Sequence, residues 1–533
     1  MHQNKAVLKN LSLIILSVLS GLLLWLSWPV LNTTVMIFIA FVPLLYAADF
    51  VKTKMHFFYL SLITTLVWNI GATWWVINST EFAIFAFIFN ALLMCIPLMG
   101  YFIFKRKYGV LTGSAALVFF WMTFEYLHLN WQLSWPWLTL GNVFAGQSDY
   151  ILWYSYTGVA GGTLWVLITN LLIKYIFTEC VEDRKENKWF SKMLLIAIVI
   201  IVIPVVISNI IYSNSKEPDT ASKKEVIIVQ PNIDPYQKFD ANSFNKQMDL
   251  LITLSEKNID SGTALILWPE TALCQQVEQN ELKNSLYYQK VFEFLNRHPK
   301  VSLQSGFDSY KLYNSQATPT ARKISSGIYA DAYNSAVVLK AGKPIPFYNK
   351  SKLVPGVETL PTYFKFLASF FEKFGGTSGG YGMDSMAKAF TIDQTEFKTA
   401  PIICYESVYG EYVASYVAHG ANLLTIMTND GWWENTPGHK QHLEYARLRA
   451  IETNSFVIRS ANTGISAVID HNGKILQTLS WDKQGVIKAV IPERKFSNTF
   501  YTAHGDYLFL IASWLSVAFL LFHFVSFFKN SKP

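Results

Sequence analysis

Three polar side chains in the second half of the chain are placed where a strand could present a reactive group. Cys404 follows the apolar run 401–403, Glu270 follows the run 264–268 and a proline, and Lys350 lies between them in the chain. A thiol beside a general base becomes a nucleophilic thiolate, and a nearby cation stabilises both the thiolate and the oxyanion of an attacked carbonyl. The three residue types together indicate nucleophilic acyl chemistry.

Each of these residues also has an ordinary structural interpretation when it is taken alone. A cysteine after an apolar run is usually a buried core residue, and Glu270 could cap a helix or stand in solvent. Lys350 and Lys352 could both be solvated loop lysines. A disulfide between Cys274 and Cys404 would silence the thiol, although the four cysteines of the chain form neither a disulfide framework nor a metal motif.

The elements expected around these residues form an α/β domain. From residue 223 on, short apolar runs alternate with turn residues, and strands are expected at 225–230, 264–268, 301–307, 335–340, 400–404, 423–428, 456–460, 465–470 and 486–491. Amphipathic helices are expected at 243–257, 280–296 and 439–452. Alternating strands and helices predict a layered domain with a buried sheet, and the His-Asn-Gly turn at 471–473 predicts a hairpin.

The rest of the chain is far more apolar than a soluble protein. Of its 533 residues 51% are hydrophobic and only 15% are charged. Runs of the length that crosses a bilayer, about 17 to 25 residues, lie at 10–28, 33–50, 57–78, 82–104, 110–127, 150–177, 192–213 and 506–528. We therefore expect eight transmembrane helices: seven in residues 1–213, then a polar domain at 214–500, then one helix and a short cytoplasmic tail in residues 501–533.

Positive charges occupy every second connection between these runs. The connections 29–32, 79–81 and 128–149 contain no Lys or Arg, whereas the alternate ones carry Lys52, Lys54, Lys105, Arg106, Lys107, Arg184, Lys185 and Lys188. Cytoplasmic loops hold an excess of Lys and Arg, so both termini are expected in the cytoplasm and the polar domain on the far side of the membrane. The net charge of +7 is thus mainly a topology signal, and no basic cluster predicts a nucleic-acid partner.

The connection 128–149 is rich in tryptophan, and Glu125 lies just before it, near the end of an expected span. Tryptophan is enriched where lipid meets water, so this connection is expected to form either an aromatic belt or a lipid-facing vestibule. A carboxylate near the end of a span is expected to reach the interface rather than to relay protons.

Three motifs resemble those of the carbon-nitrogen hydrolase (nitrilase) superfamily. They are Trp-Pro-Glu ending at Glu270, Lys-x-x-Leu-Val-Pro beginning at Lys350, and Ile-Cys-Tyr-Glu around Cys404. With spans before and after the polar domain, almost the whole chain resembles the bacterial apolipoprotein N-acyltransferase family, which also has segments similar to 229–233, 428–432 and 459–464. The resemblance implies a nitrilase-like αββα sandwich on the periplasmic side of a bacterial inner (cytoplasmic) membrane.

The reaction implied by this resemblance moves a fatty acyl chain from a membrane phospholipid to a diacylated apolipoprotein. Glu270 would take the proton of Cys404, the thiolate would attack the ester, and Lys350 would stabilise the oxyanion together with a backbone N–H after the cysteine. The thioester on Cys404 would then acylate the N-terminal amine of the S-diacylglyceryl cysteine. No cofactor and no metal are implied.

The resemblance also implies supporting residues. Glu358 would hold the lysine, while Tyr405 and Glu406 would either support catalysis or make structural hydrogen bonds around the cysteine. Phe239 stands where the family usually has tryptophan, and Pro-Gly-Val-Glu at 355–358 replaces the usual Pro-Phe-Gly-Glu. Both differences concern the expected acyl pocket, to which Trp432 would also contribute.

The strongly apolar segment 362–374 is followed by a glycine-rich stretch at 375–382. It is expected to be either an amphipathic lid, dipping Phe366 and Phe370 into the bilayer surface and hinged by the glycines, or an ordinary core helix with a loop.

His439 and His442 fall on one helical face, but no third metal ligand is evident, so a capping or packing role is favoured. Asn429 and Asp430 are expected to shape the loop at the end of their strand.

Two other functions use the same sequence features. A membrane-tethered amidase or nitrilase would use the same three residues with water as the acceptor. A scaffold or transporter with a degenerate hydrolase domain is the second alternative, and the scarcity of charged residues in the expected spans speaks against an ion pathway.

Overall fold

The computed structural model describes residues 2–80, 83–178, 187–215, 222–240, 242–360, 380–494 and 498–530. Unit 1 comprises Met1–Ile77, Phe82–Ser213 and His504–Pro533, and unit 2 comprises Asn78–Glu81 and Asn214–Ala503. The domain boundaries expected at 213/214 and 500/501 stay predictions, and residues 78–81 group with unit 2.

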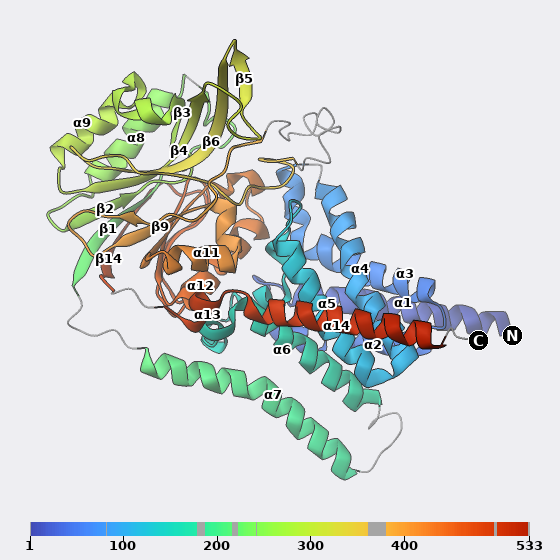
Figure 1. Cartoon of the computed structure of the whole chain (residues 1–533). Helices are drawn as coiled ribbons and strands as arrows, with labels where there is room; N and C mark the ends of the chain where they lie inside the picture. Colours follow the sequence, from blue (N-terminus) through green and yellow to red (C-terminus); the bar gives the residue numbers. More distant parts are fainter. Residues whose placement is uncertain are drawn as a thin grey trace. The chain divides into compact units, whose positions relative to one another are not determined.

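Unit 1 is helical (Figure 1). Its α-helices are α1 (His2–Leu26), α2 (Val42–Phe50), α3 (Lys54–Thr73), α4 (Ala83–Tyr108), α5 (Val110–Leu129), α6 (Tyr154–Ile176), α7 (Asn187–Asn214) and α14 (Tyr507–Asn530). Among the described residues, six helices are long and apolar enough to cross a membrane: Lys54–Asn78, Ala83–Tyr108, Val110–Leu129, Tyr154–Ile176, Trp189–Asn214 and Tyr507–Lys529.

The other two expected spans are shorter apolar helices, Asn10–Leu26 and Thr34–Phe50. The second of them is not one α-helix, because a 3-10 helix, Thr34–Ile39, precedes α2. A 3-10 helix leads the chain at a different rise and has poorer hydrogen bonds than an α-helix. Several apolar helices of a membrane protein are therefore present, and the count of eight spans stays a prediction.

The Glu125 side chain does not extend outward, as a carboxylate that reaches the interface would, but is buried. Only 3% of this side chain is exposed, and its carboxylate accepts hydrogen bonds from Trp121 Nε1 at 2.9 Å, from the Leu140 backbone N–H at 2.8 Å and from Thr163 Oγ1 at 2.7 Å. The connection after α5 folds inward as short 3-10 helices, Pro136–Leu138 and Leu140–Phe144, whose residues are buried. The buried carboxylate satisfies a backbone donor of this connection, a contact that charge patterning does not reveal.

Unit 2 contains two β-sheets in its described part. The first has the order β14-β1-β2-β4-β6-β5, with β3 paired to β4 and β7 paired to β6. Its strands are β1 (Lys223–Gln230), β2 (Thr263–Leu267), β3 (Leu273–Glu278), β4 (Ser302–Tyr313), β5 (Arg322–Ser325), β6 (Ile328–Leu339), β7 (Phe347–Asn349) and β14 (Gly485–Pro492).

The second sheet has the order β13-β12-β11-β10-β9-β8. Its strands are β8 (Phe390–Thr391), β9 (Lys398–Ile403), β10 (Leu423–Thr428), β11 (Phe456–Ala461), β12 (Ser466–Ile469) and β13 (Ile475–Leu479). Strand β10 lies between β9 and β11 and is parallel to both. In the first sheet β1, β2 and β4 are parallel neighbours. Parallel strands place their carboxyl ends at one edge, which is where polar loops meet in each sheet.

Alternating side chains of the strands build four layers. Val226 and Ile228 of β1 join a core with β9, β10 and β11, whereas Ile227 and Val229 of the same strand pack with α8 (Phe244–Glu256) and α9 (Gln289–Arg297). Successive side chains of a strand point to opposite faces of a sheet, so one strand serves both cores. The helices α11 (Gly410–Ala418) and α12 (Pro437–Thr453) cover the second sheet. Figure 1 shows the two helical layers outside the two sheets, which confirms the αββα sandwich.

All nine expected strands are present, and the hairpin at 471–473 joins the antiparallel strands β12 and β13. The helix expected at 280–296 is wrong in its first half. Two 3-10 helices, Gln279–Asn284 and Leu286–Tyr288, precede α9, and the extended backbone of Ser285 separates them. The amphipathic pattern did not reveal this break, because the apolar residues keep one face through both helix types.

Candidate active site

Cys404 lies directly after β9 in a strained turn. Its φ is 49°, a left-handed conformation that is uncommon for a residue other than glycine. The 3-10 helix Cys404–Val408 begins at this residue, so the chain reverses from strand to helix at the thiol. Ile402 and Ile403 are fully buried, whereas Cys404 is partly exposed. Cys404 and Cys274 are both free thiols, so the disulfide considered above is not formed.

A buried chain of polar groups holds the carbonyl of Cys404. Ser407 Oγ donates to this carbonyl at 2.7 Å, and His442 Nε2 lies 2.8 Å from Ser407 Oγ and 3.3 Å from the carbonyl oxygen. His442 Nδ1 is 2.9 Å from Asp430 Oδ1, and Arg459 Nη2 donates to Asp430 Oδ2 at 2.6 Å. Burial acts to raise the pKa of Asp430, but Arg459 and His442 hold this pKa well below its ordinary value. The strained turn at Cys404 is thus held by this buried chain of hydrogen bonds and ion pairs.

Glu270 follows β2 and Pro269 and is nearly buried, with 7% of its surface exposed. Its Oε1 accepts a hydrogen bond from Asn334 Nδ2 at 2.8 Å and lies 3.3 Å from Lys350 Nζ. Two donors, one on β6 and one directly after β7, therefore fix the orientation of this carboxylate.

Lys350 follows the short strand β7 and is 1% exposed. Its Nζ is 2.8 Å from Glu358 Oε1 as well as 3.3 Å from Glu270. Glu358 is held in turn by Asn334 Nδ2 at 3.2 Å and by the Val354 backbone N–H at 2.8 Å. Burial acts to lower the pKa of Lys350, but the carboxylates of Glu358 and Glu270 raise it above its ordinary value. The lysine is thus a permanent cation between two carboxylates.

The structure distinguishes Lys350 from its neighbour Lys352. The ammonium of Lys352 lies over the rings of Tyr409 and Tyr412, 5.1 and 5.5 Å from their centroids. Of the two candidate lysines, Lys350 is the one that faces Glu270.

The three predicted residues Glu270, Lys350 and Cys404 come together. Burial raises the pKa of the Cys404 thiol well above its ordinary value, the Glu270 charge raises it further, and the Lys350 charge lowers it. A thiol in this environment stays protonated in the resting protein, so a base must remove its proton at the moment of attack. The charges of Glu270 and Lys350 both act on this thiol, which makes Glu270 the candidate for that base.

Glu406, two residues after the cysteine, is completely buried. It accepts backbone hydrogen bonds from Ile403 at 2.8 Å, from Ser351 at 2.7 Å and from Lys352 at 3.3 Å. The Tyr348 hydroxyl also donates to it. Burial raises the pKa of Glu406 to about 7. Two roles were expected for Glu406, support of catalysis or structural hydrogen bonding around the cysteine. These backbone contacts correspond to the structural role.

The remaining supporting residues lie between strands, in 3-10 helices or in a loop. Tyr405 is 4% exposed and packs edge to face on Tyr409 with ring centroids 5.3 Å apart. Phe239 is 51% exposed in the loop after β1, and Trp432, in the 3-10 helix Asp430–Trp433 after β10, contacts the Tyr236 ring at 5.4 Å. Phe366, Phe370 and the whole segment 362–374 lie outside the described residues.

Sequence reasoning missed Asn334, Ser407 and Arg459 as parts of the site. Asn334 lies inside β6 and has no local signature, because only the pairing of β6 with β4 and β7 brings it to both carboxylates. Of the capping or packing role expected for both histidines, His439 shows packing, whereas His442 makes polar contacts with the loop after β9 and with Asp430. His439 stacks on Trp481 with centroids 4.3 Å apart, and His442 makes the contacts described above.

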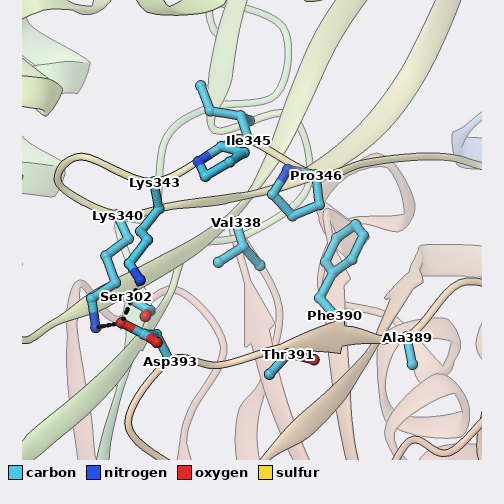
Figure 2. Close-up of a pocket in the computed structure, with 11 residues that line it drawn as sticks. Ser302, Val338, Lys340, Lys343, Ile345, Pro346, Ala389, Phe390, Thr391 and Asp393 are labelled. Atoms are coloured by element: carbon cyan, nitrogen blue, oxygen red, sulfur yellow. Dashed lines mark ion pairs between the residues drawn. The ribbon is translucent and has the colours of Figure 1, made fainter.

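A cavity of about 450 Å³ elsewhere in unit 2 contains none of the three predicted catalytic residues. Figure 2 shows Lys340 and Lys343 converging on Asp393, at 3.1 and 3.6 Å, beneath an apolar wall that includes Ile345 and Phe390. Two ammonium groups share one carboxylate there, and the cavity is separate from the three predicted residues.

Comparison with known proteins agrees with both units. Residues 226–496 match the carbon-nitrogen hydrolase family, and residues 20–172 match the apolipoprotein N-acyltransferase N-terminal domain. The apolipoprotein N-acyltransferase of Chlorobaculum tepidum is 32% identical over 503 residues, covering 92% of each chain. That of Thermotoga maritima is 25% identical and covers 96% of this chain and 93% of its own length.

Among solved structures, Nit3 of Saccharomyces cerevisiae, a member of the nitrilase superfamily, is 17% identical with a TM-score of 0.37. It covers 54% of this chain and 96% of its own. An amidase from Nesterenkonia sp. AN1, bearing a covalent acetamide on its active-site cysteine, is 15% identical with a TM-score of 0.36 and covers 55% and 94%.

Proposed function

This chain belongs to the apolipoprotein N-acyltransferase family, and from that premise we propose that Cys404, Glu270 and Lys350 carry out its acyl transfer. The protein is a membrane acyltransferase of lipoprotein maturation. The donor is a membrane phospholipid, and the acceptor is the N-terminal amine of the S-diacylglyceryl cysteine of an apolipoprotein. The observation that carries the proposal is the position of Lys350 between Glu270 and Glu358, with the charges of Glu270 and Lys350 both acting on the thiol.

In the first half-reaction the ionised carboxylate of Glu270 takes the thiol proton while the Cys404 sulfur attacks the ester carbonyl carbon. The carbonyl oxygen becomes an oxyanion, which Lys350 and the Tyr405 backbone N–H stabilise. The carbon–oxygen bond to glycerol then breaks, and Glu270 gives the proton to the leaving oxygen. A lysophospholipid leaves, and the acyl chain remains as a thioester on Cys404.

In the second half-reaction the neutral amine of the lipoprotein attacks the thioester carbon. Glu270 takes a proton from the attacking nitrogen, Lys350 again stabilises the oxyanion, and the carbon–sulfur bond breaks. The products are an amide and the Cys404 thiol, which recovers its proton from Glu270. One site thus serves both substrates in turn, and we expect ping-pong kinetics.

Glu358 and Glu406 act through other residues. Glu358 holds the ammonium of Lys350, and Glu406 holds the backbone on both sides of the site. Unless both are in place, the cation has no fixed position relative to the thiol.

The distribution of positive charges supports an orientation for the protein in a bacterial inner membrane. Lys105, Arg106 and Lys107 end α4 in the last turn of a candidate span, and their excess over the alternate connections favours the cytoplasmic side for that end. Unit 2 would then face the periplasm, and both termini the cytoplasm. A periplasmic catalytic domain meets both lipid-anchored substrates at the membrane surface.

The test is the intact mass of the purified protein after incubation with phospholipid and no acceptor. We expect a mass gain of one fatty acyl chain that neutral hydroxylamine removes, present in wild type and in Cys274→Ala and absent in Cys404→Ala. Cys274→Ala is the matched control, since this free cysteine is buried in the same unit. A folded wild type whose Cys404 reacts with iodoacetamide but never gains an acyl group would overturn phospholipid as the donor and favour the tethered amidase.

A further inference from the structure

Lys238 is a buried lysine for which the reaction above has no role. It lies in the loop after β1, and only 1% of its surface is exposed. Its Nζ donates to the backbone carbonyl of Glu270 at 2.6 Å and to Thr271 Oγ1 at 2.7 Å. Within the described ranges no carboxylate oxygen lies within the 4.0 Å of an ion pair from this nitrogen. Lys238 therefore binds a turn of the backbone rather than a single counter-ion.

The turn that Lys238 binds is strained and closely packed. Thr271 has a φ of 45°, which is left-handed for a residue with a branched side chain. On its other side the turn presses on Gly306 of β4, where a Cβ would lie 2.3 Å from the Thr271 nitrogen and 2.7 Å from the Glu270 Cα. Such a conformation persists only when its surroundings hold it, and Lys238 supplies two of the contacts that do so.

Lys238 is itself held in place. Gln247 of α8 donates to the Lys238 carbonyl at 2.9 Å and to Ser243 Oγ at 2.6 Å. These contacts fix the backbone from which the long side chain reaches the turn. The Lys238 side chain therefore connects the loop after β1 to the loop after β2.

The ammonium of Lys238 also acts electrostatically on the site. Burial lowers the pKa of Lys238 to about 8, while four facing groups oppose this shift: Glu270, Cys274, Asp308 and Cys404. Burial also raises the pKa of Asp308 to about 6. A cation beside a carboxylate favours its ionised form.

We propose that Lys238 is a positioning residue for Glu270, holding the strained turn from which this carboxylate projects and placing a positive charge close to it, so that it can accept the Cys404 proton. The proposal rests on the role of Glu270 as the base in the proposed function. It assigns two separable effects to one side chain: the hydrogen bonds set the geometry of the base, and the charge sets the pH range in which the base works.

The test is the rate at which iodoacetamide alkylates Cys404 in the full-length protein in detergent, measured on the Cys404 peptide from pH 5 to pH 9. The variants are Lys238→Met, Lys238→Gln and Lys238→Arg. Lys340→Met is the matched control, because Lys340 is also a largely buried lysine of unit 2 but lines the separate cavity of Figure 2. Glu270→Gln is the reference for a site without its base.

Loss of the charge moves the acid limb of the profile to higher pH by roughly one unit in both Lys238→Met and Lys238→Gln, because the carboxylate then holds its proton more tightly. Loss of the donors lowers the plateau rate about tenfold in Lys238→Met, and less in Lys238→Gln, which keeps a donor. Lys238→Arg restores the position of the limb, and Lys340→Met matches wild type.

The proposal is overturned if the acid limb stays in place in Lys238→Gln and Lys238→Met, even if both react more slowly, since a purely structural role changes the rate without moving the pH profile. Should Lys238→Met not fold, Lys238→Gln carries the test. Alkylation needs no lipid, so a wild type that alkylates normally but forms no acyl-enzyme refutes the proposed function and leaves the role of Lys238 measurable.

Discussion

The carboxylate of Glu406 accepts a hydrogen bond of 2.7 Å from the backbone N–H of Ser351. This contact joins the segment that carries Lys350 to the turn that carries Cys404, because the other oxygen of Glu406 accepts from the Ile403 backbone. The cation and the nucleophile come from different sheets, and one fully buried carboxylate sets the backbone of both. Their distance is thus fixed by main-chain contacts rather than by flexible side chains.

Glu406 should make stability depend on pH in a direction opposite to that of an ordinary salt-bridged carboxylate. Burial raises its pKa from 4.5 to about 7 in the folded protein. Between these values the folded state keeps a proton that the unfolded state has released, so the stability of wild type falls as pH rises. Relative to Glu406→Gln, the loss is at most about 3 kcal/mol across this window. Melting temperatures of both proteins at pH 5, 6, 7 and 8 check it, and a constant difference between them would contradict the raised pKa.

Replacing Lys350 by methionine should abolish acyl-enzyme formation and also destabilise unit 2. The substitution leaves Glu270 and Glu358 close together without the cation that lies 3.3 and 2.8 Å from them. Removing one partner of a buried ion pair typically costs about 3 to 5 kcal/mol. Lys352→Met is the control, because its ammonium lies over tyrosine rings instead. Intact mass and melting temperature are measured together. Equal acylation in the two variants would show that the assignment to Lys350 is wrong.

The substitution Gly306→Ala should displace the base without touching any polar group. A Cβ at this position would lie 2.3 Å from the Thr271 nitrogen, so the turn that carries Glu270 must shift. Overpacking of this kind typically costs about 1 to 3 kcal/mol. We expect acyl-enzyme formation to fall at least about tenfold, the change that a displaced catalytic group produces. The control is Gly262→Ala, where the nearest atom to a Cβ is the Asp260 carboxylate at 3.4 Å; unchanged acylation in Gly306→Ala would contradict the close packing.

His442→Asn should slow the reaction of Cys404 more than His439→Asn does. Both histidines are fully buried on α12. Only His442 contacts Ser407 and the Cys404 carbonyl, whereas His439 stacks on Trp481. Leaving Ser407 and Asp430 without the imidazole costs about 1 to 3 kcal/mol in His442→Asn, and His439→Asn loses the stacking on Trp481, so both variants should melt earlier. Iodoacetamide labelling of Cys404 separates them, and equal labelling rates would show that the buried chain does not act on the cysteine.

The sequence was enough to predict the nine expected strands and the layered α/β class of unit 2, although not its short strands or the break before α9. Short apolar runs that end at Pro269 and at Cys404 predict strands, because a strand is recognised from a local apolar run and the residue that terminates it. Glu270, Lys350 and Cys404 were identified because each stands in a motif of distinctive residue types. The apolar helices of unit 1 were evident for the same reason, since crossing a bilayer demands composition and length.

Only the tertiary structure decided which side chains share the site. Asn334 meets both carboxylates through strand pairing, Glu406 bridges two sheets, and Lys238 reaches the base from a third loop. The burial of Glu125 was missed because two of its partners, Leu140 in the connection after α5 and Thr163 on α6, are brought to it only by the packing of unit 1. Each of these contacts joins residues distant in sequence, or pairs a side chain with the backbone. The periodicity of apolar residues along the chain does not predict such contacts, because they depend on how the layers of the fold pack together.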